Sequence, residues 1–237
     1  MLFVPIGSVL LLVSIIYWFK PQADGWDMAW VKAGKEGALP TNMIAASKEI
    51  RTNNWWGMML LIVIEVVAIG AILSSYYYLR GRSLEWPLGQ VDPPDLLLPT
   101  INSFILWIAI IPMYLSVYYM KRGNQAFSRI ALVVMGLMSV LFVVLKVYEY
   151  STLNYNWAVN AYTSIIWLIS GFHISHVLAV VFKTAVVGYY AFRGYYNEER
   201  YDGVLTNALY GYFVSLIWIP MYFTVYLAPY LLRGPEG

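Results

Sequence analysis

The chain has 237 residues, of which 60% are apolar, 17% aromatic and only 12% charged. An ordinary soluble domain carries about 25% charged residues, so a soluble fold of this size could not hide so much apolar surface. We therefore expect an integral membrane protein with one membrane domain. The absence of cysteine excludes disulfides, cysteine-ligated iron–sulfur clusters, c-type haem attachment and thiolate copper centres on this chain. A net charge of +2 gives no support for nucleic-acid binding.

Six apolar runs are long enough to cross about 30 Å of hydrocarbon, which takes roughly 20 helical residues. They cover residues 2–19, 56–79, 97–119, 127–148, 162–192 and 205–232. The pattern predicts an all-α, polytopic membrane bundle of six transmembrane helices. Its parts are an N-terminal helix at 1–19, an inner-side loop at 20–54 and a five-helix membrane domain at 55–237. The first run has no basic segment before it and no small-residue cleavage site, which indicates an anchor rather than a signal peptide.

Prolines mark one loop and two helix bends. The outer connection at 85–99 contains four prolines, which predicts an extended, stiff cover. Pro112 and Pro220 fall inside the third and sixth spans. Each removes a backbone hydrogen bond, so we expect both helices to bend there.

The basic residues predict the orientation, because the inner loops of membrane proteins carry an excess of lysine and arginine. With the N-terminus outside, the inner connections hold ten of the 15 basic residues: Lys20, Lys32, Lys35, Lys48, Arg51, Lys121, Arg122, Arg129, Arg193 and Arg200. The outer segments hold three (Arg80, Arg82 and Arg233), and Lys146 and Lys183 lie inside spans. We therefore expect both termini on the outer side.

Three ionisable side chains lie near the middle of predicted spans, where each costs about 2.5–3.5 kcal/mol on insertion scales. Glu65 is roughly 12 Å into the second span at 1.5 Å per residue. His173 and His176 lie near the middle of the fifth span, which runs in the opposite direction, and their spacing puts both on one helix face. The shared depth predicts a hydrogen-bonded cluster, with Glu65 protonated unless an imidazolium pairs with it.

Three interpretations of this cluster remain open: a metal site, a proton relay through Glu65, and a polar clamp between the second and fifth helices. We favour the clamp and assign no catalytic residue to the cluster. A closed metal site needs more ligands than the two histidines and one carboxylate supply, so we expect no metal on this chain. Haem between the histidines is excluded, because residues three apart on one helix cannot reach opposite faces of a porphyrin.

Two more charged groups lie near span ends. Lys146 and Glu149 are three residues apart near the outer end of the fourth span, which predicts a local ion pair at the interface worth roughly 0.2–0.5 kcal/mol. Lys183 lies near the inner end of the fifth span, where we expect its long side chain to reach water.

Several motifs in sequence resemble subunit III of the haem-copper terminal oxidases. The segment 57–66 is similar to the helix that carries that family's buried glutamate, which places the glutamate at Glu65. Ser-Gly-Phe-His-Ile-Ser-His-Val at 170–177 is close to the family's Gly-Phe-His-x-x-His-Val signature. Further matches are Trp-Pro-Leu-Gly at 86–89, Pro-Thr-Ile-Asn-Ser at 99–103, Arg-Gly-Asn-Gln at 122–125 and Glu-Tyr at 149–150. The resemblance covers about residues 57–232.

The last helix departs from the family pattern. Where the family usually shows Tyr-Trp-His-Phe-Val-Asp, residues 210–215 read Tyr-Gly-Tyr-Phe-Val-Ser. The chain therefore lacks that histidine and aspartate, together with any proton or lipid handling that depends on them. It is identified as a divergent, prokaryotic member of the family.

The resemblance implies a non-redox subunit, with haem and copper on partner subunits and none on this chain. It implies packing on catalytic subunit I of a proton-pumping respiratory complex in the plasma or inner membrane of a prokaryote. It also implies a V-shaped bundle whose cleft holds phospholipid and guides dioxygen. Because of their shared depth, we expect Glu65 and His176, with His173 nearby, to fix the cleft floor between the second and fifth helices. Alternatives are an accessory subunit of a quinol oxidase or nitric oxide reductase system, and a proton-coupled transporter. Against the transporter, the sequence shows no inverted repeat.

Overall fold

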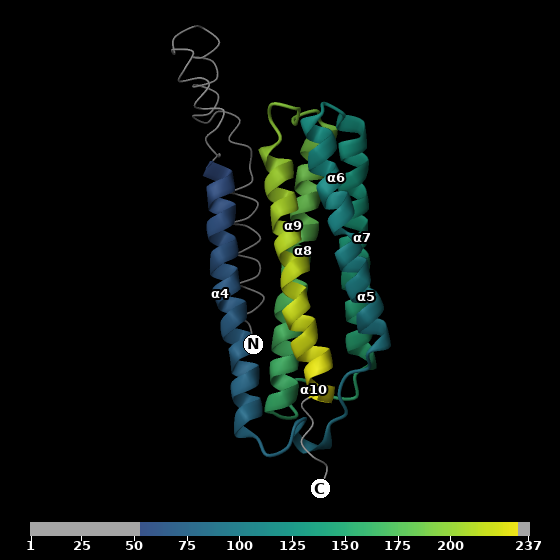
Figure 1. The fold of residues 1–237 in the computed structure, drawn as a ribbon. Coiled ribbons are helices and arrows are strands. Elements are labelled where there is room, and N and C mark those ends of the chain that lie inside the picture. Colours follow the sequence, from purple (N-terminus) through teal and green to yellow (C-terminus); the bar gives the residue numbers. More distant parts are fainter. Residues whose placement is uncertain (1–52, 232–237) are drawn as a thin grey trace. The chain divides into compact units, whose positions relative to one another are not determined.

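The computed structural model describes residues 53–231. The predicted helix at 2–19 and nearly all of the predicted loop at 20–54 lie outside these residues. The described part is helical and contains no strand. Its elements are α4 (Asn53–Arg82), the 3-10 turn η1 (Leu88–Gln90), α5 (Leu97–Ile108), α6 (Ile110–Lys121), α7 (Gln125–Thr152), α8 (Ala161–Phe192), α9 (Asp202–Tyr222), the π-helical turn η2 (Phe223–Leu227) and α10 (Ala228–Leu231) (Figure 1).

Within residues 53–231, five helical segments are long and apolar enough to cross a membrane. They are Asn54–Arg82, Leu97–Lys121, Gln125–Thr152, Ala161–Phe192 and Asp202–Leu231. The all-α prediction is thereby confirmed for five of the six predicted spans, and the sixth is the one outside the described residues. The longest, α8, has 32 residues, or about 48 Å at 1.5 Å per residue. It exceeds a hydrocarbon core of about 30 Å, so it must tilt or project beyond it.

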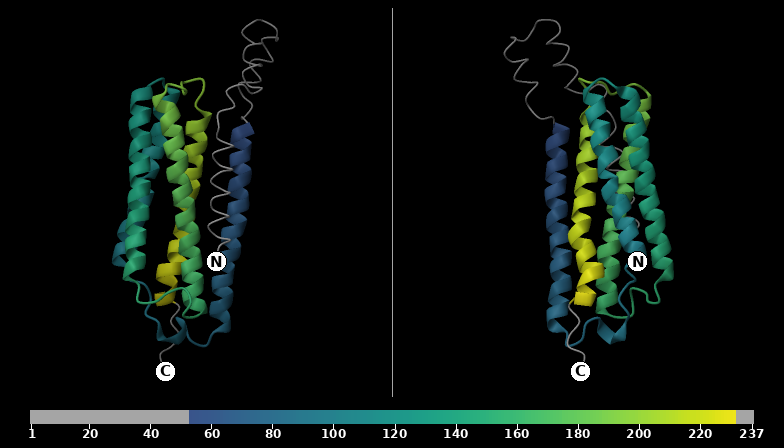
Figure 2. Two further views of the ribbon diagram at one scale, coloured as in Figure 1. Left: turned by 180° about the vertical axis from the view of Figure 1, so that it is seen from behind. Right: turned by 45° about the vertical axis from the view of Figure 1, so that its right-hand side comes forward.

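Helices α5 to α9 pack side by side, and consecutive spans run antiparallel (Figure 2). Helix α7 lies against α5, α6 and α8, and α9 lies against the same three helices. The core between them includes Leu106, Met113, Met135, Phe142 and Trp218, each at most 2% exposed. The polar side chains described below are embedded in this core.

The outward surface of the bundle is apolar as well. Along α7, Ile130, Leu137 and Val144 are 58%, 64% and 57% exposed. A helix that is apolar on both its inner and outer sides is typical of a membrane span, because lipid covers the outer side. The side chains able to do chemistry therefore lie in the interior or at the ends of the spans.

Both predicted proline bends coincide with interruptions of regular α-helix. The third span divides at Ala109 into α5 and α6, three residues before Pro112, whose missing amide leaves the Ile108 carbonyl without its helical partner. In the last span, η2 begins three residues after Pro220. The Thr224 hydroxyl donates to the Pro220 carbonyl oxygen over 2.8 Å in this turn. The wider π turn shifts the register of the residues that follow it.

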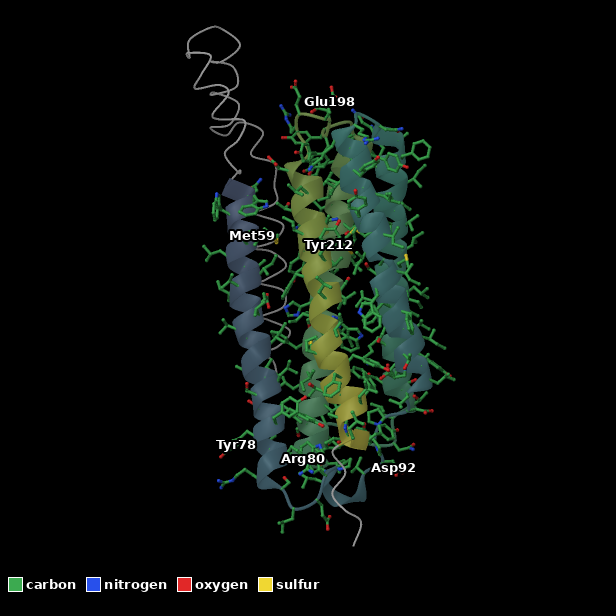
Figure 3. The ribbon with its side chains drawn as sticks, in the orientation of Figure 1. Met59, Tyr78, Arg80, Asp92, Glu198 and Tyr212 are labelled. Atoms are coloured by element: carbon green, nitrogen blue, oxygen red, sulfur yellow. The ribbon has the colours of Figure 1, made fainter. Side chains whose placement is uncertain are left out.

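The two ends of the bundle differ. We call one end the loop end, which contains residues 83–96 and 153–160, and the other the turn end, which contains residues 122–124 and 193–201. Figure 3 shows Arg80 and Asp92 at the loop end and Glu198 at the turn end. At the loop end, side-chain hydrogen bonds attach the proline-rich segment to the helices, so it is not simply an extended cover. Trp86 is buried and donates its Nε1–H to the Tyr76 hydroxyl over 3.0 Å, and the Asn160 amide donates to the Leu88 carbonyl over 2.9 Å.

Candidate functional site

A short hydrogen bond joins α4 to α8 inside the spans. The Glu65 Oε2 atom lies 2.5 Å from His176 Nε2. The other ring nitrogen, Nδ1, lies 2.6 Å from the Phe172 carbonyl oxygen. A carbonyl oxygen only accepts, so Nδ1 carries a hydrogen. Nε2 and Oε2 therefore share one proton, either as imidazolium with carboxylate or as neutral imidazole with carboxylic acid.

Most of this pair is shielded by protein, with 7% of the His176 side chain and 18% of the Glu65 side chain exposed. In a membrane span, an unpaired carboxylate or imidazole would cost several kcal/mol, about 2.5–3.5 on insertion scales. The pairing offsets part of that cost for both groups, because each satisfies a hydrogen-bonding atom of the other. Chemically, the site can hold a single proton, and mechanically it fastens α4 to α8.

Helix α4 has few other attachments to the rest of the described chain. At the loop end, the Tyr77 hydroxyl lies 3.2 Å from Thr224 Oγ1 in η2. Most of the surface of α4 is exposed and apolar, as at Leu60 (63%) and Val67 (67%). Figure 3 shows Tyr78, which is 64% exposed, pointing away from the other helices. The Glu65–His176 contact is consequently a main attachment of α4 at mid-span.

His173 is not part of this pair, although the sequence predicted a three-member cluster. Its Nε2 donates to the Val214 carbonyl oxygen of α9 over 3.1 Å. Its ring stacks on Trp218 with centroids 4.2 Å apart and meets Phe142 edge-on at 5.6 Å. Residues three apart on a helix differ by about 60° in direction. On α8, which has neighbours on several sides, that difference turns His176 toward α4 and His173 toward α9.

A second polar cluster comprises Lys146, Glu149 and Tyr226. The Lys146 ammonium donates to both Glu149 carboxylate oxygens over 2.9 Å and also to the Tyr226 hydroxyl. The Tyr226 hydroxyl in turn donates to Glu149. The ammonium also lies 5.2 Å from the ring centroid of Trp218, so an aromatic face covers it.

The setting of this ion pair differs from the prediction. Lys146 is 1% and Glu149 5% exposed, so the pair is buried in the bundle rather than placed at the interface. The spacing along α7 indicated the contact, and the burial arises because η2 brings Tyr226 over both groups. The expected value of a few tenths of a kcal/mol applies to exposed pairs and does not apply here.

Lys183 also differs from the prediction. Its side chain was expected to reach water, but the residue is 3% exposed. Its ammonium donates to the Thr206 carbonyl oxygen of α9 over 2.6 Å and lies 5.4 Å from the Tyr210 ring centroid. The expectation was wrong because Lys183 lies on the side of α8 that faces α9.

Among the described residues, no three His, Cys, Asp or Glu side chains lie close enough together to hold a metal ion.

At the turn end, outside the spans, burial raises the pKa of Tyr196 to about 12. That phenol therefore remains neutral throughout the physiological range.

Comparison with known proteins identifies the family. The chain matches cytochrome c oxidase subunit III over residues 1–230. It belongs to this family. The predicted resemblance to oxidase subunit III is thereby confirmed, and the chain is a multi-pass membrane protein of a respiratory oxidase.

Three curated relatives show how distant the similarity is. Cytochrome c oxidase subunit 3 of Thermostichus vulcanus is 27% identical over 164 residues, which make up 69% of this chain and 81% of the relative. The subunit of the same name from Synechocystis is 26% identical over 157 residues, 66% of this chain and 67% of the relative. A probable quinol oxidase subunit 3 of Staphylococcus saprophyticus is 25% identical over 144 residues, 59% of this chain and 71% of the relative.

The structure of this subunit III family member also shows residues that the sequence did not single out. Trp218 connects three elements: its ring stacks on His173, its Nε1 donates to Ser103 Oγ over 2.8 Å, and it faces Lys146. Tyr226 completes the Lys146–Glu149 cluster. One signal could have revealed them, since Trp218, Tyr222 and Tyr226 recur every four residues. That spacing places large aromatic groups on one helix face.

Proposed function

We propose that this chain is the non-redox subunit III of a proton-pumping haem-copper terminal oxidase of aerobic respiration. In this proposal it packs on catalytic subunit I, which carries haem and copper and reduces dioxygen. The match to the subunit III family over residues 1–230 carries the proposal. The apolar outward surface of the bundle, seen along α7, supports it, since such a surface is suited to contact with lipid and with other membrane subunits.

We assign to the Glu65–His176 pair the task of fixing the floor of a lipid-containing cleft beside α4. The 2.5 Å contact supports this assignment, because it joins α4 to α8 where α4 has few other attachments. His173 belongs to the supporting shell on the α9 side, stacked on Trp218. Phospholipid in this cleft would give apolar dioxygen a path toward subunit I, and the shared proton would keep the junction electrically neutral.

We further propose that the protein lies in the plasma or inner membrane of a prokaryote with both termini outside. In that orientation the turn end faces inward, since it carries Lys121, Arg122, Arg193 and Arg200. The segment 2–19 would then be the sixth span.

A second candidate differs only in the electron donor. The similarity to a probable quinol oxidase subunit 3 favours a quinol-oxidising complex as the alternative to a cytochrome c oxidase. The two candidates share the fold and the role of this chain, and they differ in the redox centres of the partner subunits.

The first experiment is purification of the intact complex in mild detergent through a tag on this chain. We expect haem and copper to co-purify with a larger catalytic subunit, detected by a redox difference spectrum and a copper assay. Oxidase activity measured separately with reduced cytochrome c and with quinol would then decide between the two donors. A colourless chain that purifies alone would contradict the proposal.

Substitution of Glu65 tests the assigned role of the pair. Glu65→Leu removes the bond to His176, and we expect loss of bound phospholipid and a severalfold shorter turnover lifetime of the complex. Glu65→Gln keeps one hydrogen bond without the shared charge, so its effect should be intermediate. The control is Val67→Leu, at a position of α4 that is 67% exposed. Unchanged assembly, lipid content and turnover lifetime in Glu65→Leu would refute the assignment.

A further inference from the structure

A shallow groove runs along the outer side of α7 at the turn end of the bundle. It has a volume of about 380 Å³ and is lined by Ala126, Arg129, Ile130, Val133, Val134 and Phe192. Five of the six lining side chains are apolar, and the exception is Arg129. Volumes of roughly 300–1,000 Å³ are typical of sites for small ligands. The groove therefore combines one cation with an apolar channel.

The guanidinium of Arg129 is held in place on one side and has donors to spare on the other. Its Nη2 donates to Gln125 Oε1 over 2.8 Å, and its Cζ lies 6.0 Å from the Phe192 ring centroid. Its Nε is buried and has no hydrogen-bond partner among the described residues. No carboxylate in residues 53–231 pairs with it within 4.0 Å. A guanidinium offers five N–H donors in a planar fork, so this one retains capacity for an anion.

The depth of the groove identifies the kind of ligand. Helix α7 begins at Gln125, so Arg129 lies about 6 Å from the start of the span at 1.5 Å per residue. The apolar side chains continue to Val134, about 14 Å from the same point. This order, with a cation at headgroup depth and apolar walls toward the midplane, matches a phospholipid with its phosphate outermost. Basic pockets between spans bind anionic headgroups in the same way.

We propose that the α7 groove is a binding site for one anionic phospholipid, whose phosphate pairs with Arg129 and whose acyl chain lies along Ile130, Val133 and Val134. The first turn of α7 adds a favourable field, because a helix N-terminus carries partial positive charge. None of the lining residues lies on α4, so this site is separate from the cleft proposed above. It requires only that α7 spans the membrane and does not depend on the oxidase partner.

The test uses the intact complex and a phosphatidylglycerol with a photoactivatable acyl chain. We expect crosslinks on residues 126–134 that unlabelled phosphatidylglycerol displaces better than phosphatidylcholine does. In Arg129→Gln, the competing phosphatidylglycerol should bind about tenfold more weakly, as expected for loss of a charge-assisted hydrogen bond. Ile130→Trp fills the groove and should reduce labelling in competition with either lipid.

Arg122→Gln is the matched control, because it removes a positive charge from the same end of the bundle and Arg122 is not among the residues that line the groove. Three results would overturn the proposal. One is equal weakening by Arg122→Gln and Arg129→Gln, which would indicate general surface charge. Another is uniform labelling along residues 126–148, which would indicate bulk lipid only. The third is absence of labelling together with loss of partner subunits in Ile130→Trp, which would indicate that another subunit covers the groove.

Discussion

The Lys146–Glu149 pair has an energetic consequence at the scale of single residues. Both groups are almost fully buried, and the Tyr226 hydroxyl bonds to each of them. Removing one member of a buried ion pair leaves the other charge without compensation, which costs about 3–5 kcal/mol. Removing both charges together costs much less, because no isolated charge remains.

We therefore predict that Lys146→Met destabilises the chain more than the double variant Lys146→Met/Glu149→Gln. In the double variant, the glutamine carbonyl still accepts from the Tyr226 hydroxyl. The free energies of unfolding are measured by denaturant titration of the full chain in detergent. Lys121→Met, at an exposed position, serves as the control and should have the smallest effect. A double variant as unstable as Lys146→Met would refute this account.

The sequence revealed part of this chemistry and missed the rest for a physical reason. The spacing of Lys146 and Glu149 predicts their contact because it depends only on local helix geometry. The third member, Tyr226, lies 77 residues beyond Glu149 in sequence. Its position depends on how α9 packs against α7 and on the π turn after Pro220. Likewise, shared depth predicted the Glu65–His176 contact, but depth alone could not show that His173 turns toward α9.

At the scale of helices, Gly211 of α9 lies close to side chains of two neighbouring helices. A Cβ atom placed on this glycine would lie 2.7 Å from Met113 Sδ and 3.1 Å from Met135 Cε. The family pattern usually has a tryptophan at this position, and here Met113 of α6 and Met135 of α7 fill the space instead. The glycine and the two methionines therefore act as one packing unit that joins three helices.

We predict that Gly211→Leu destabilises the chain by about 1–3 kcal/mol, the usual cost of overpacking a filled core. Gly211→Ala should cost less, because methionine side chains are flexible and can move aside. The control is Gly188→Leu in α8, since no atom of the described residues lies within 4 Å of a Cβ added there. The thermal midpoint of the purified complex is a suitable measurement. Equal effects at the two glycines would contradict the packing argument.

The helices themselves were largely predictable, since an apolar run of 20 or more residues leaves few alternatives in a membrane. Pro112 and Pro220 also indicated where regular helix is interrupted. The form of each interruption was not predictable. Both prolines remove one backbone hydrogen bond, but the result is a break at Ala109 in one span and a π turn at 223–227 in the other. Neighbouring helices decide which one forms.

At the scale of the whole molecule, the remaining question is which end of the bundle faces inward. The lysines and arginines predict that the turn end does, because among the described residues this end carries Lys121, Arg122, Arg129, Arg193 and Arg200, whereas the loop end carries Arg80 and Arg82. The sequence prediction also places the segment 20–54 inside and the N-terminus outside, and the two placements together require that the segment 2–19 cross the membrane. Orientation and the sixth span are therefore linked predictions.

The absence of cysteine makes both predictions testable, since any introduced thiol is the only one on the chain. We predict that a membrane-impermeant maleimide labels Glu85→Cys and Leu2→Cys in intact cells. Glu199→Cys and Glu36→Cys should react only after the membrane is permeabilised. Both Glu85 and Glu199 are exposed, so lack of labelling would reflect the membrane barrier rather than burial of the side chain.

Labelling of Glu199→Cys but not Glu85→Cys in intact cells would show the opposite orientation. Labelling of Glu36→Cys together with Leu2→Cys in intact cells would show that the segment 2–19 does not span the membrane.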